Sequence, residues 1–247
     1  MRSSTPGAPP TLLSARTWAL WTGALSAVLL VLVAVDWAPL ISVDRKVAHR
    51  LHRDAVAEPG LTEANQVLSD WVWDPWTMRA LIAVAVVALW WRGQRRLALW
   101  VAATSVLATV VQQGLKTALG RERPRWPDPV DFAHYAAYPS GHAMTAAVTC
   151  GLLLWLLARR YPGPRLWWAA VALAVVSVLG VGLTRIYLGV HWITDVVGGW
   201  LLGALTVALA VLLYGRGGGW RQGHEGRPKP PVLRRSPASP QNRRPPR

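Results

Sequence analysis

Six stretches of this chain are long enough and apolar enough to cross a lipid bilayer, and no other feature narrows the fold so strongly. A spanning helix needs about 20 mostly apolar residues, because its backbone must satisfy its own hydrogen bonds within hydrocarbon. The stretches are residues 17–36, 76–91, 97–115, 141–158, 166–184 and 193–214. Charged residues make up only 16% of the chain, whereas soluble domains have about 25%. The sequence therefore predicts an all-α, polytopic membrane protein with six transmembrane helices in a bundle.

Basic residues in the loops predict the orientation of this bundle. One set of segments comprises residues 1–16, the loops after the second and fourth spans, and the C-terminal tail; its only acid is Glu225. Outside the tail, its basic residues are Arg2, Arg16, Arg92, Arg95, Arg96, Arg159, Arg160 and Arg165. Cytoplasmic loops carry the excess of Lys and Arg, so both termini are expected in the cytoplasm. The loops at 37–75, 116–140 and 185–192 are then expected outside the cell membrane.

The chain divides into three parts on composition. Residues 1–16 form a short N-terminal segment, residues 17–214 form the membrane domain, and residues 215–247 form a basic tail rich in Gly, Pro and Arg. The tail has too few apolar residues to form a core and is expected to be disordered. Because it contributes +8 of the net charge of +15, the charge does not indicate a nucleic-acid-binding protein. The strong preference for Arg over Lys is typical of a high-GC bacterial genome.

The first outer loop contains the pattern of an amphipathic helix. Val43, Val47 and Leu51 recur every four residues, and Ala55 continues the stripe. The basic residues between them are Arg45, Lys46, Arg50 and Arg53. This pattern predicts a short helix with one apolar face. Such a helix lies either in the interface plane of the membrane or packed on the top of the bundle, and the sequence leaves both alternatives open.

Three clusters of polar residues lie where the pattern of apolar spans does not require them. They are Lys116, Arg123 and Pro124; Pro139, Ser140, Gly141 and His142; and Arg185, His191 and Asp195. The orientation derived from the basic loops places all three clusters on the same, outer side of the bilayer. Residues of these types, gathered on one side, predict a shared site.

The first property of this predicted site is its affinity for phosphate. Lys116, Arg123 and Arg185 supply three cations, and the planar guanidinium of arginine offers paired donors that match phosphate oxygens. Ser140 and Gly141 open a predicted helix, whose free backbone N–H groups form an anion site. The sequence therefore predicts a pocket for a phosphoryl group.

Two histidines provide the chemistry. His191 and Asp195 are four residues apart and share a face if this segment is helical, so the carboxylate can fix the tautomer of the imidazole and leave its other nitrogen free to attack. His142 is the expected proton donor to the leaving oxygen. These roles predict a bell-shaped dependence of rate on pH. Zinc binding by His142, His191 and Asp195 is the alternative, and three cations in the same pocket argue against it.

These motifs resemble the type 2 phosphatidic acid phosphatase superfamily, also called lipid phosphate phosphatases. The family pattern is K-x6-RP, then PSGH, then SR-x5-H-x3-D, and this sequence departs from it only at Thr184, where serine is usual. The resemblance implies that His191 forms a phosphohistidine, that Asp195 orients it and that His142 protonates the leaving group. It also implies that the phosphate is bound by Lys116, Arg123, Ser140, Gly141 and Arg185. No metal or other cofactor is implied, and the active site is expected to face outward.

The predicted function is hydrolysis of a lipid phosphate or diphosphate such as undecaprenyl diphosphate, phosphatidylglycerol phosphate or phosphatidic acid. Two alternatives are a vanadate-dependent haloperoxidase, since those soluble enzymes are similar to this family, and a non-catalytic scaffold or transporter that has kept the motifs. The expected partners are the lipid substrate and the bilayer, with no nucleic acid, and the sequence does not indicate an oligomeric state. Arg121, Arg125 and His134 lie outside the motifs and are interpreted as solvated loop charges.

Overall fold

The computed structural model describes residues 12–160 and 163–216, and every regular element in these residues is a helix. The elements are α1 (Leu12–Ala34), α2 (Ala38–Ala57), α3 (Pro59–Val67), the short π-helical turn η1 (Leu68–Val72), α4 (Pro75–Trp91), α5 (Arg95–Leu119), α6 (Gly141–Ala158), α7 (Pro164–Tyr187) and α8 (Ile193–Arg216). Six helical stretches are long and apolar enough to span a membrane, which confirms the predicted all-α fold and the number of spans. The flanking segments predicted at 1–16 and 215–247 lie almost entirely outside the described residues.

The second span differs most from its prediction. The structure has one apolar helical stretch over Pro59–Trp91, whereas the sequence predicted a span over 76–91. The predicted start is still a real helix start, because the carboxylate of Asp74 accepts a hydrogen bond from the backbone N–H of Trp76 at 2.6 Å and Pro75 occupies the first turn of α4. The residues before it are also helical, as α3 and η1, so the helical stretch is longer than predicted.

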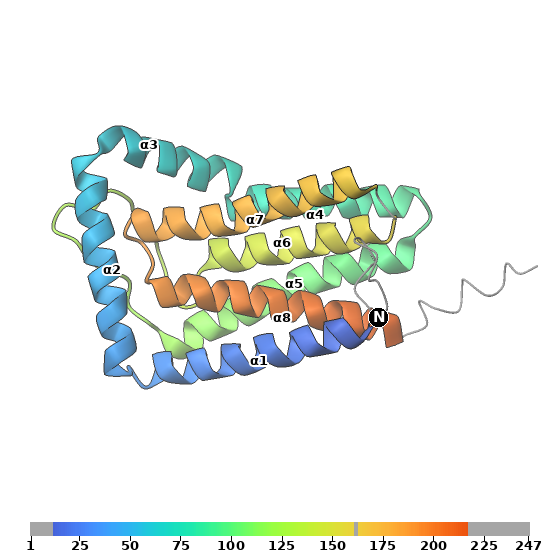
Figure 1. Cartoon of the computed structure of the whole chain (residues 1–247), viewed down its shortest axis with the longest axis horizontal. Helices are drawn as coiled ribbons and strands as arrows, with labels where there is room; N and C mark the ends of the chain where they lie inside the picture. The colour runs from blue at the N-terminus through green and yellow to red at the C-terminus, as the bar shows by residue number, and fades with distance from the viewer. Residues whose placement is uncertain (1–11, 161–162, 217–247) are drawn as a thin grey trace, which may run out of the picture.

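Helix α6 lies inside the bundle, in contact with α4, α5, α7 and α8 (Figure 1). Glycines let α8 approach it closely: a Cβ atom added to Gly199 would lie 2.8 Å from the carbonyl oxygen of Ser140, and one added to Gly203 would lie 2.7 Å from Cβ of Ala147. Small residues serve this purpose between membrane helices. The close approach lets the backbone N–H of Ser140 donate to the carbonyl oxygen of Asp195 at 2.9 Å.

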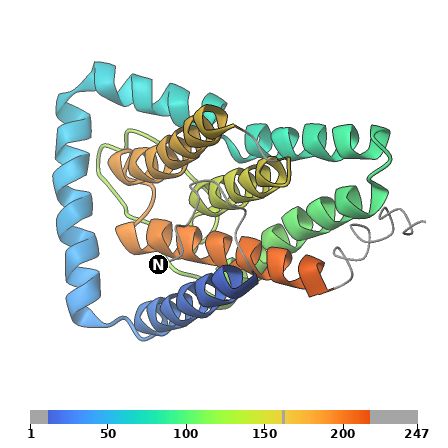
Figure 2. The same cartoon turned by 45° about the vertical axis from the view of Figure 1, so that its right-hand side comes forward.

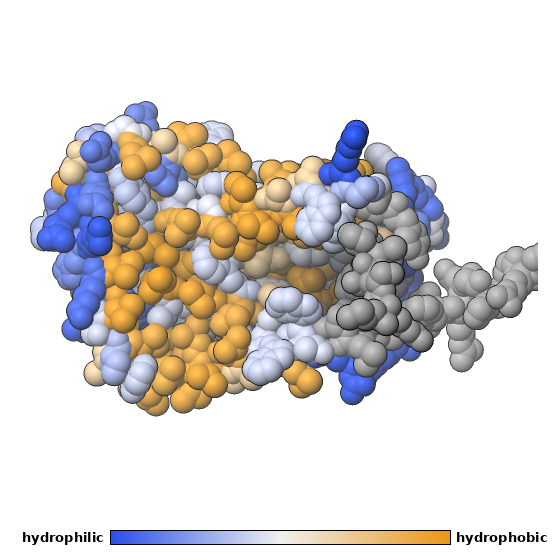
Figure 3. Space-filling model, in the orientation of Figure 1, coloured by the Kyte–Doolittle hydropathy of each residue, from blue (hydrophilic) through white to orange (hydrophobic). Residues whose placement is uncertain are grey.

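The outer surface of the bundle is apolar. Large side chains point away from the core along several helices; Leu20 is 73% exposed and Leu173 is 68% exposed. Figure 3 shows a hydrophobic band between two hydrophilic ends. So much contiguous apolar surface is incompatible with water but is required by lipid. The chain is a multi-pass membrane protein.

The predicted amphipathic helix is present as α2, which crosses one end of the bundle (Figures 1 and 2). It contacts α7 and α8, so it packs on the bundle, which was one of the two alternatives. The predicted apolar stripe agrees in part, because Ala55 is buried and Val47 and Leu51 pack against the core, while Val43 is exposed. The buried residues of α2 also include Asp44, Ala48 and His52, and the carboxylate of Asp44 is hydrogen-bonded, as described below.

Candidate active site

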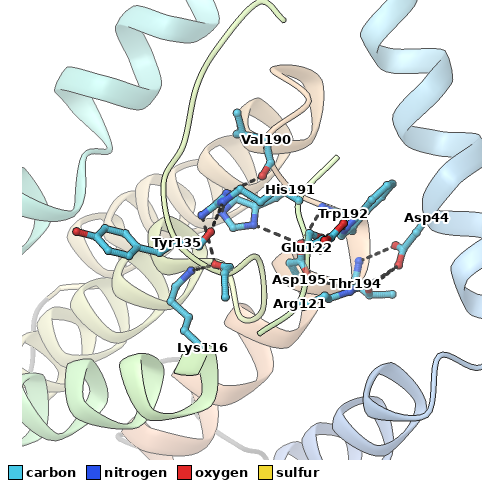
Figure 4. Close-up of polar contacts among 12 residues, drawn as sticks. Asp44, Lys116, Arg121, Glu122, Tyr135, Val190, His191, Trp192, Thr194 and Asp195 are labelled. Atoms are coloured by element: carbon cyan, nitrogen blue, oxygen red, sulfur yellow. Dashed lines mark hydrogen bonds and ion pairs between the residues drawn. The ribbon is translucent and has the colours of Figure 1, made fainter. Parts of the chain in front are cut away.

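The structure brings the three sequence clusters together at the end of the bundle that α2 crosses. Lys116 lies in the last turn of α5, which ends at Gly120 in a left-handed conformation with φ of 56°. His142 lies in the first turn of α6 and Arg185 in the last turn of α7. Asp195 lies in the first turn of α8. The chemistry-bearing residues thus come from four helix ends and the two loops that join them. Figure 4 shows Lys116, His191 and Asp195 of this set.

The imidazole of His191 lies between a carboxylate and a guanidinium group. Its Nδ1 is 3.3 Å from Oδ2 of Asp195, and its Nε2 is 3.0 Å from a guanidinium nitrogen of Arg123. Both His191 and Asp195 are buried. A single neutral tautomer satisfies both contacts, with Nδ1–H donating to Asp195 and Nε2 accepting from Arg123. Nε2 is then the nitrogen with an available lone pair.

The surroundings of His191 favour this neutral form. Burial is the largest effect and lowers the pKa of His191 well below its ordinary value of 6.5, and the positive charges of Arg123, Arg185 and Lys116 lower it further. Burial also lowers the pKa of Arg123, to about 10, so its guanidinium still carries a proton at neutral pH. The site therefore combines a neutral imidazole with a neighbouring cation.

The three cations are held by oxygen atoms of the protein. Nζ of Lys116 donates to the carbonyl of Ala136 at 2.5 Å. Arg123 donates to the carbonyls of Val190 at 2.6 Å and Tyr135 at 2.9 Å. Arg185 donates to the hydroxyl of Ser69 and to the carboxylate of Asp131. The distances for Arg185 are 2.8 Å and 3.2 Å respectively. Asp131 and Ser69 thus share one nitrogen of the Arg185 guanidinium, whose Nε has no partner among the described residues.

The start of α6 matches the predicted anion site. Ser140 is its N-terminal cap, and the Ser140 hydroxyl is fully buried without a hydrogen-bond partner among the described residues. A Cβ atom added to Gly141 would lie 2.8 Å from Nε2 of Gln112, so the backbone here is closely approached. His142 interacts electrostatically with Arg185, His191, Arg123 and Lys116. The hydroxyl of Thr184, at the position where the pattern departs, donates within its own helix to Val181.

Arg121 corrects an interpretation made from the sequence. It was taken as a solvated loop charge, but its side chain is only 10% exposed and forms two ion pairs. One guanidinium nitrogen donates to Asp195 at 2.5 Å and the other to Asp44 of α2 at 2.7 Å. Asp44 also accepts from the backbone N–H and the hydroxyl of Thr194. Arg125 and His134 are exposed, as interpreted.

A signal for this network was present in the sequence. Asp44 is an acid within the helical repeat of the amphipathic segment, and a carboxylate on a buried face requires a partner. Arg121 directly follows Gly120, the left-handed residue that ends α5 and turns the chain. Neither residue belongs to a motif, so only the three-dimensional fold connects them to Asp195.

A cavity of about 690 Å³ lies beside the dyad of His191 and Asp195, against the loop between α5 and α6. Its lining includes Arg123, Asp131, Tyr135 and Val190. Tyr135 and the neighbouring Phe132 are highly exposed. Of the predicted site residues, only Arg123, whose guanidinium contacts His191, lines this cavity together with the adjacent Pro124.

Comparison with known proteins agrees with this geometry. The family model described as "PAP2 superfamily" matches residues 97–218, which include all three clusters. The chain is 29% identical over 157 residues to an undecaprenyl-diphosphatase of Sulfolobus acidocaldarius, a match that covers 60% of this chain and 66% of the relative. It is 37% identical over 93 residues to phosphatidylglycerophosphatase B of Bacillus subtilis, covering 37% of this chain and 45% of the relative. The matches thus span less than two thirds of either relative.

A solved structure shares the fold. It is the crystal structure of a transmembrane PAP2 type phosphatidylglycerolphosphate phosphatase from Bacillus subtilis. The TM-score is 0.71 at 22% sequence identity, and the match covers 80% of this chain and 96% of that structure. Taken with the family match over the motif-bearing region, the six-helix fold and the dyad at its end show that this chain belongs to the PAP2 superfamily.

Proposed function

We propose that this chain is a membrane lipid phosphatase that hydrolyses a phosphate monoester or diphosphate of a lipid. The observation that carries the proposal is the position of His191 between the carboxylate of Asp195 and the guanidinium of Arg123. A neutral imidazole with one nitrogen fixed by a carboxylate is a nucleophile, and a guanidinium beside the other nitrogen marks where phosphate oxygens bind. The names of the PAP2 relatives support the same class of substrate.

In the first step, Nε2 of His191 attacks phosphorus and the bond from phosphorus to the leaving oxygen breaks. His142 gives its proton to that oxygen, so the lipid leaves as an alcohol or, from a diphosphate, as a monophosphate. Arg123 exchanges its contact with Nε2 for contacts with phosphate oxygens. Lys116 and Arg185, with the hydroxyl of Ser140 and the backbone N–H of Gly141, stabilise the charge on the transferred group.

In the second step, water attacks phosphorus of the phosphohistidine and the bond to Nε2 breaks. His142, now neutral, accepts the proton of that water, and inorganic phosphate leaves. Asp195 keeps the proton on Nδ1 throughout and stabilises the positive charge that develops on the ring. The covalent intermediate is inferred from the resemblance of the motifs to those of the family.

Arg121 is a positioning residue in this scheme. It contacts neither His191 nor the bound phosphate, but it fixes the carboxylate of Asp195 and connects it to α2 through Asp44. Arg121 also donates to the hydroxyl of Thr194, and the backbone N–H of Trp192 donates to the carboxylate of Asp195. Together these contacts leave the carboxylate few alternative orientations. A rigid orienting group keeps the nucleophile in line with phosphorus.

The location of the site suits a lipid substrate. It lies at one end of an apolar bundle, where a headgroup meets water while its chains remain in the bilayer. The charge asymmetry of the loops supports a cytoplasmic location for the opposite end, which carries the basic loops. We infer that the site lies on the outer side of a bacterial cell membrane, with both termini inside. The apolar lipid-facing surface disfavours the soluble haloperoxidase alternative.

Phosphate release by the purified protein in detergent micelles tests the proposal. The substrates are undecaprenyl diphosphate, phosphatidylglycerol phosphate and phosphatidic acid, each with and without EDTA. Activity that survives EDTA and is lost in His191→Ala supports the histidine mechanism, and the fastest lipid identifies the substrate class. No release from any of these lipids by the wild-type protein would refute the proposal and favour a scaffold that kept the motifs. Undiminished release by His191→Ala would refute the histidine mechanism.

A further inference from the structure

A second polar pocket lies at the opposite end of the bundle from the candidate active site. It has a volume of about 560 Å³ and is formed by the turn between α4 and α5, the end of α6 and Tyr214 near the end of α8. Four of its lining residues are arginines, namely Arg95, Arg96, Arg159 and Arg160. Among the described residues that line it there is no Asp or Glu. Its described lining therefore concentrates positive charge, most clearly at Arg95, Arg159 and Arg160.

Aromatic rings hold these arginines in place. The guanidinium carbon of Arg159 is 5.1 Å from the ring centre of Tyr214 and 5.5 Å from that of Trp155. The guanidinium of Arg96 is 5.8 Å from the same Tyr214 ring, so two cations contact one aromatic side chain. Such contacts position a guanidinium but do not neutralise its charge. Over residues 12–160 and 163–216, no carboxylate forms an ion pair with Arg95, Arg159 or Arg160.

Two tryptophans beside this pocket indicate that it lies at headgroup level, where lipids are available as ligands. The guanidinium carbon of Arg95 is 5.5 Å from the ring centre of Trp90. Trp90 and Trp91 are both exposed on the surface of the bundle beside this pocket. Exposed tryptophans at the ends of spans lie at the level of the lipid headgroups. The floor of the pocket is apolar, with Leu89, Leu97 and Leu156. A ligand here meets cations at headgroup depth and hydrocarbon directly beside them.

We propose that this pocket binds the phosphate group of an anionic membrane lipid. Guanidinium groups bind phosphate through paired donors, and basic pockets between membrane helices suit anionic headgroups. The occupant is separate from the substrate of His191, because Lys116 follows Arg95 by 21 positions along α5, which places the two sites about 30 Å apart. Inorganic phosphate shares the binding chemistry but gains nothing from the adjacent apolar surface.

Lipid binding to the purified, delipidated full-length chain tests this proposal. Native mass spectrometry measures the retention of phosphatidylglycerol, with phosphatidylcholine and inorganic phosphate as the comparison ligands. The pocket variant is Arg95→Gln with Arg159→Gln. The matched control is Arg92→Gln with Arg165→Gln, which removes the same charge at the same end of the bundle from residues outside the lining. The active site is common to all samples, so its own binding cancels in the comparison.

The expected result is selective retention of phosphatidylglycerol over phosphatidylcholine by the wild-type protein and the control. The pocket variant should bind phosphatidylglycerol about tenfold more weakly or worse, since each arginine near a membrane surface is worth about fivefold in affinity. Its rate of phosphate release and its thermal unfolding in phosphatidylcholine micelles should match wild type. Equal losses in the pocket variant and the control would overturn the proposal, as would a loss confined to inorganic phosphate.

Discussion

Arg121 donates a 2.5 Å hydrogen bond to Asp195, and both side chains are almost completely buried. The same guanidinium reaches Asp44 on α2, so a helix that crosses the end of the bundle is tied to the carboxylate that orients His191. A buried cation between two carboxylates compensates charges that would otherwise be costly to remove from water. This relationship links the stability of the end of the bundle to the geometry of the reaction.

Arg121→Gln is therefore expected to impair both catalysis and stability. Loss of one partner from a buried ion pair costs about 3–5 kcal/mol, and a displaced Asp195 should lower kcat by about 100-fold. Thermal unfolding and kcat, measured in the same micelles, separate the two effects. Arg121→Lys should recover more stability than activity, because one ammonium cannot bridge both carboxylates in the same geometry.

Arg125→Gln is the control for this prediction, since Arg125 lies four residues further along the same loop and is 80% exposed. It should behave as wild type in both measurements. A folded Arg121→Gln protein with wild-type kcat would show that Arg121 has no positioning role.

Asp131 is expected to compete with phosphate for Arg185. Its carboxylate lies 3.2 Å from one nitrogen of the guanidinium, so a phosphate that binds this nitrogen has to replace that contact. Asp131→Asn removes the competing charge, so inorganic phosphate and orthovanadate should inhibit the variant at concentrations about three- to fivefold lower, the effect of an ion pair worth about 1 kcal/mol. Asp128→Asn is the control, because Asp128 lies in the same loop but contacts His52 instead. Unchanged or weaker inhibition of Asp131→Asn would contradict this competition.

The pH dependence of kcat/KM should reflect the lowered pKa of His191. The neutral form is the nucleophile, so activity falls as pH drops through its pKa in the free enzyme. Because burial and three cations hold that pKa well below 6.5, the acidic limb should lie below pH 6.5. Arg123→Gln removes one of these cations, so it should raise the pKa of His191 and move the limb to higher pH, in addition to lowering the rate. A limb at pH 6.5 or above in wild type would mean that another group controls it.

Much of the fold could be predicted because a bilayer allows few solutions. A run of apolar residues such as 141–158 or 193–214 can only be a spanning helix, and both agree with α6 and α8 to within two residues. The second span was predicted too short, since Pro59–Val72 mixes polar and apolar residues and its helical structure depends on packing against α7. Its polar residues Ser69 and Asp70 contact Arg185, which no local pattern reveals.

The candidate site could be predicted only where its residues form motifs. The spacing of His191 and Asp195 predicted their contact, but His191 precedes α8, which begins at Ile193, and Asp195 in the first turn of that helix lies against it. Asp44 and Arg121 are 77 residues apart, and their contact depends on the path of α2 over the bundle. The stripe of Val43, Val47 and Leu51 predicted the helix and part of its packed face. It did not predict the burial of Asp44, because the partners of that carboxylate lie far along the chain.

Close packing of α6 against α8 is expected to be essential for the site. Gly199→Ala would place Cβ 2.8 Å from the carbonyl of Ser140 and 3.0 Å from the backbone nitrogen of Met144. Backbone atoms cannot rotate away as a flexible side chain can, so the two helices must separate and the hydrogen bond from Ser140 to Asp195 must lengthen. We expect a destabilisation of about 1–3 kcal/mol and a fall in kcat of at least tenfold. Gly114→Ala is the matched control, because Gly114 is also within a helix but an added Cβ meets no atom within 4 Å. The alanine there should leave kcat unchanged and raise stability by up to about 1 kcal/mol, as alanine favours helix over glycine. Thermal unfolding in detergent and phosphate release measure both effects. If Gly199→Ala behaved like Gly114→Ala, the spacing between α6 and α8 would not control the orientation of Asp195.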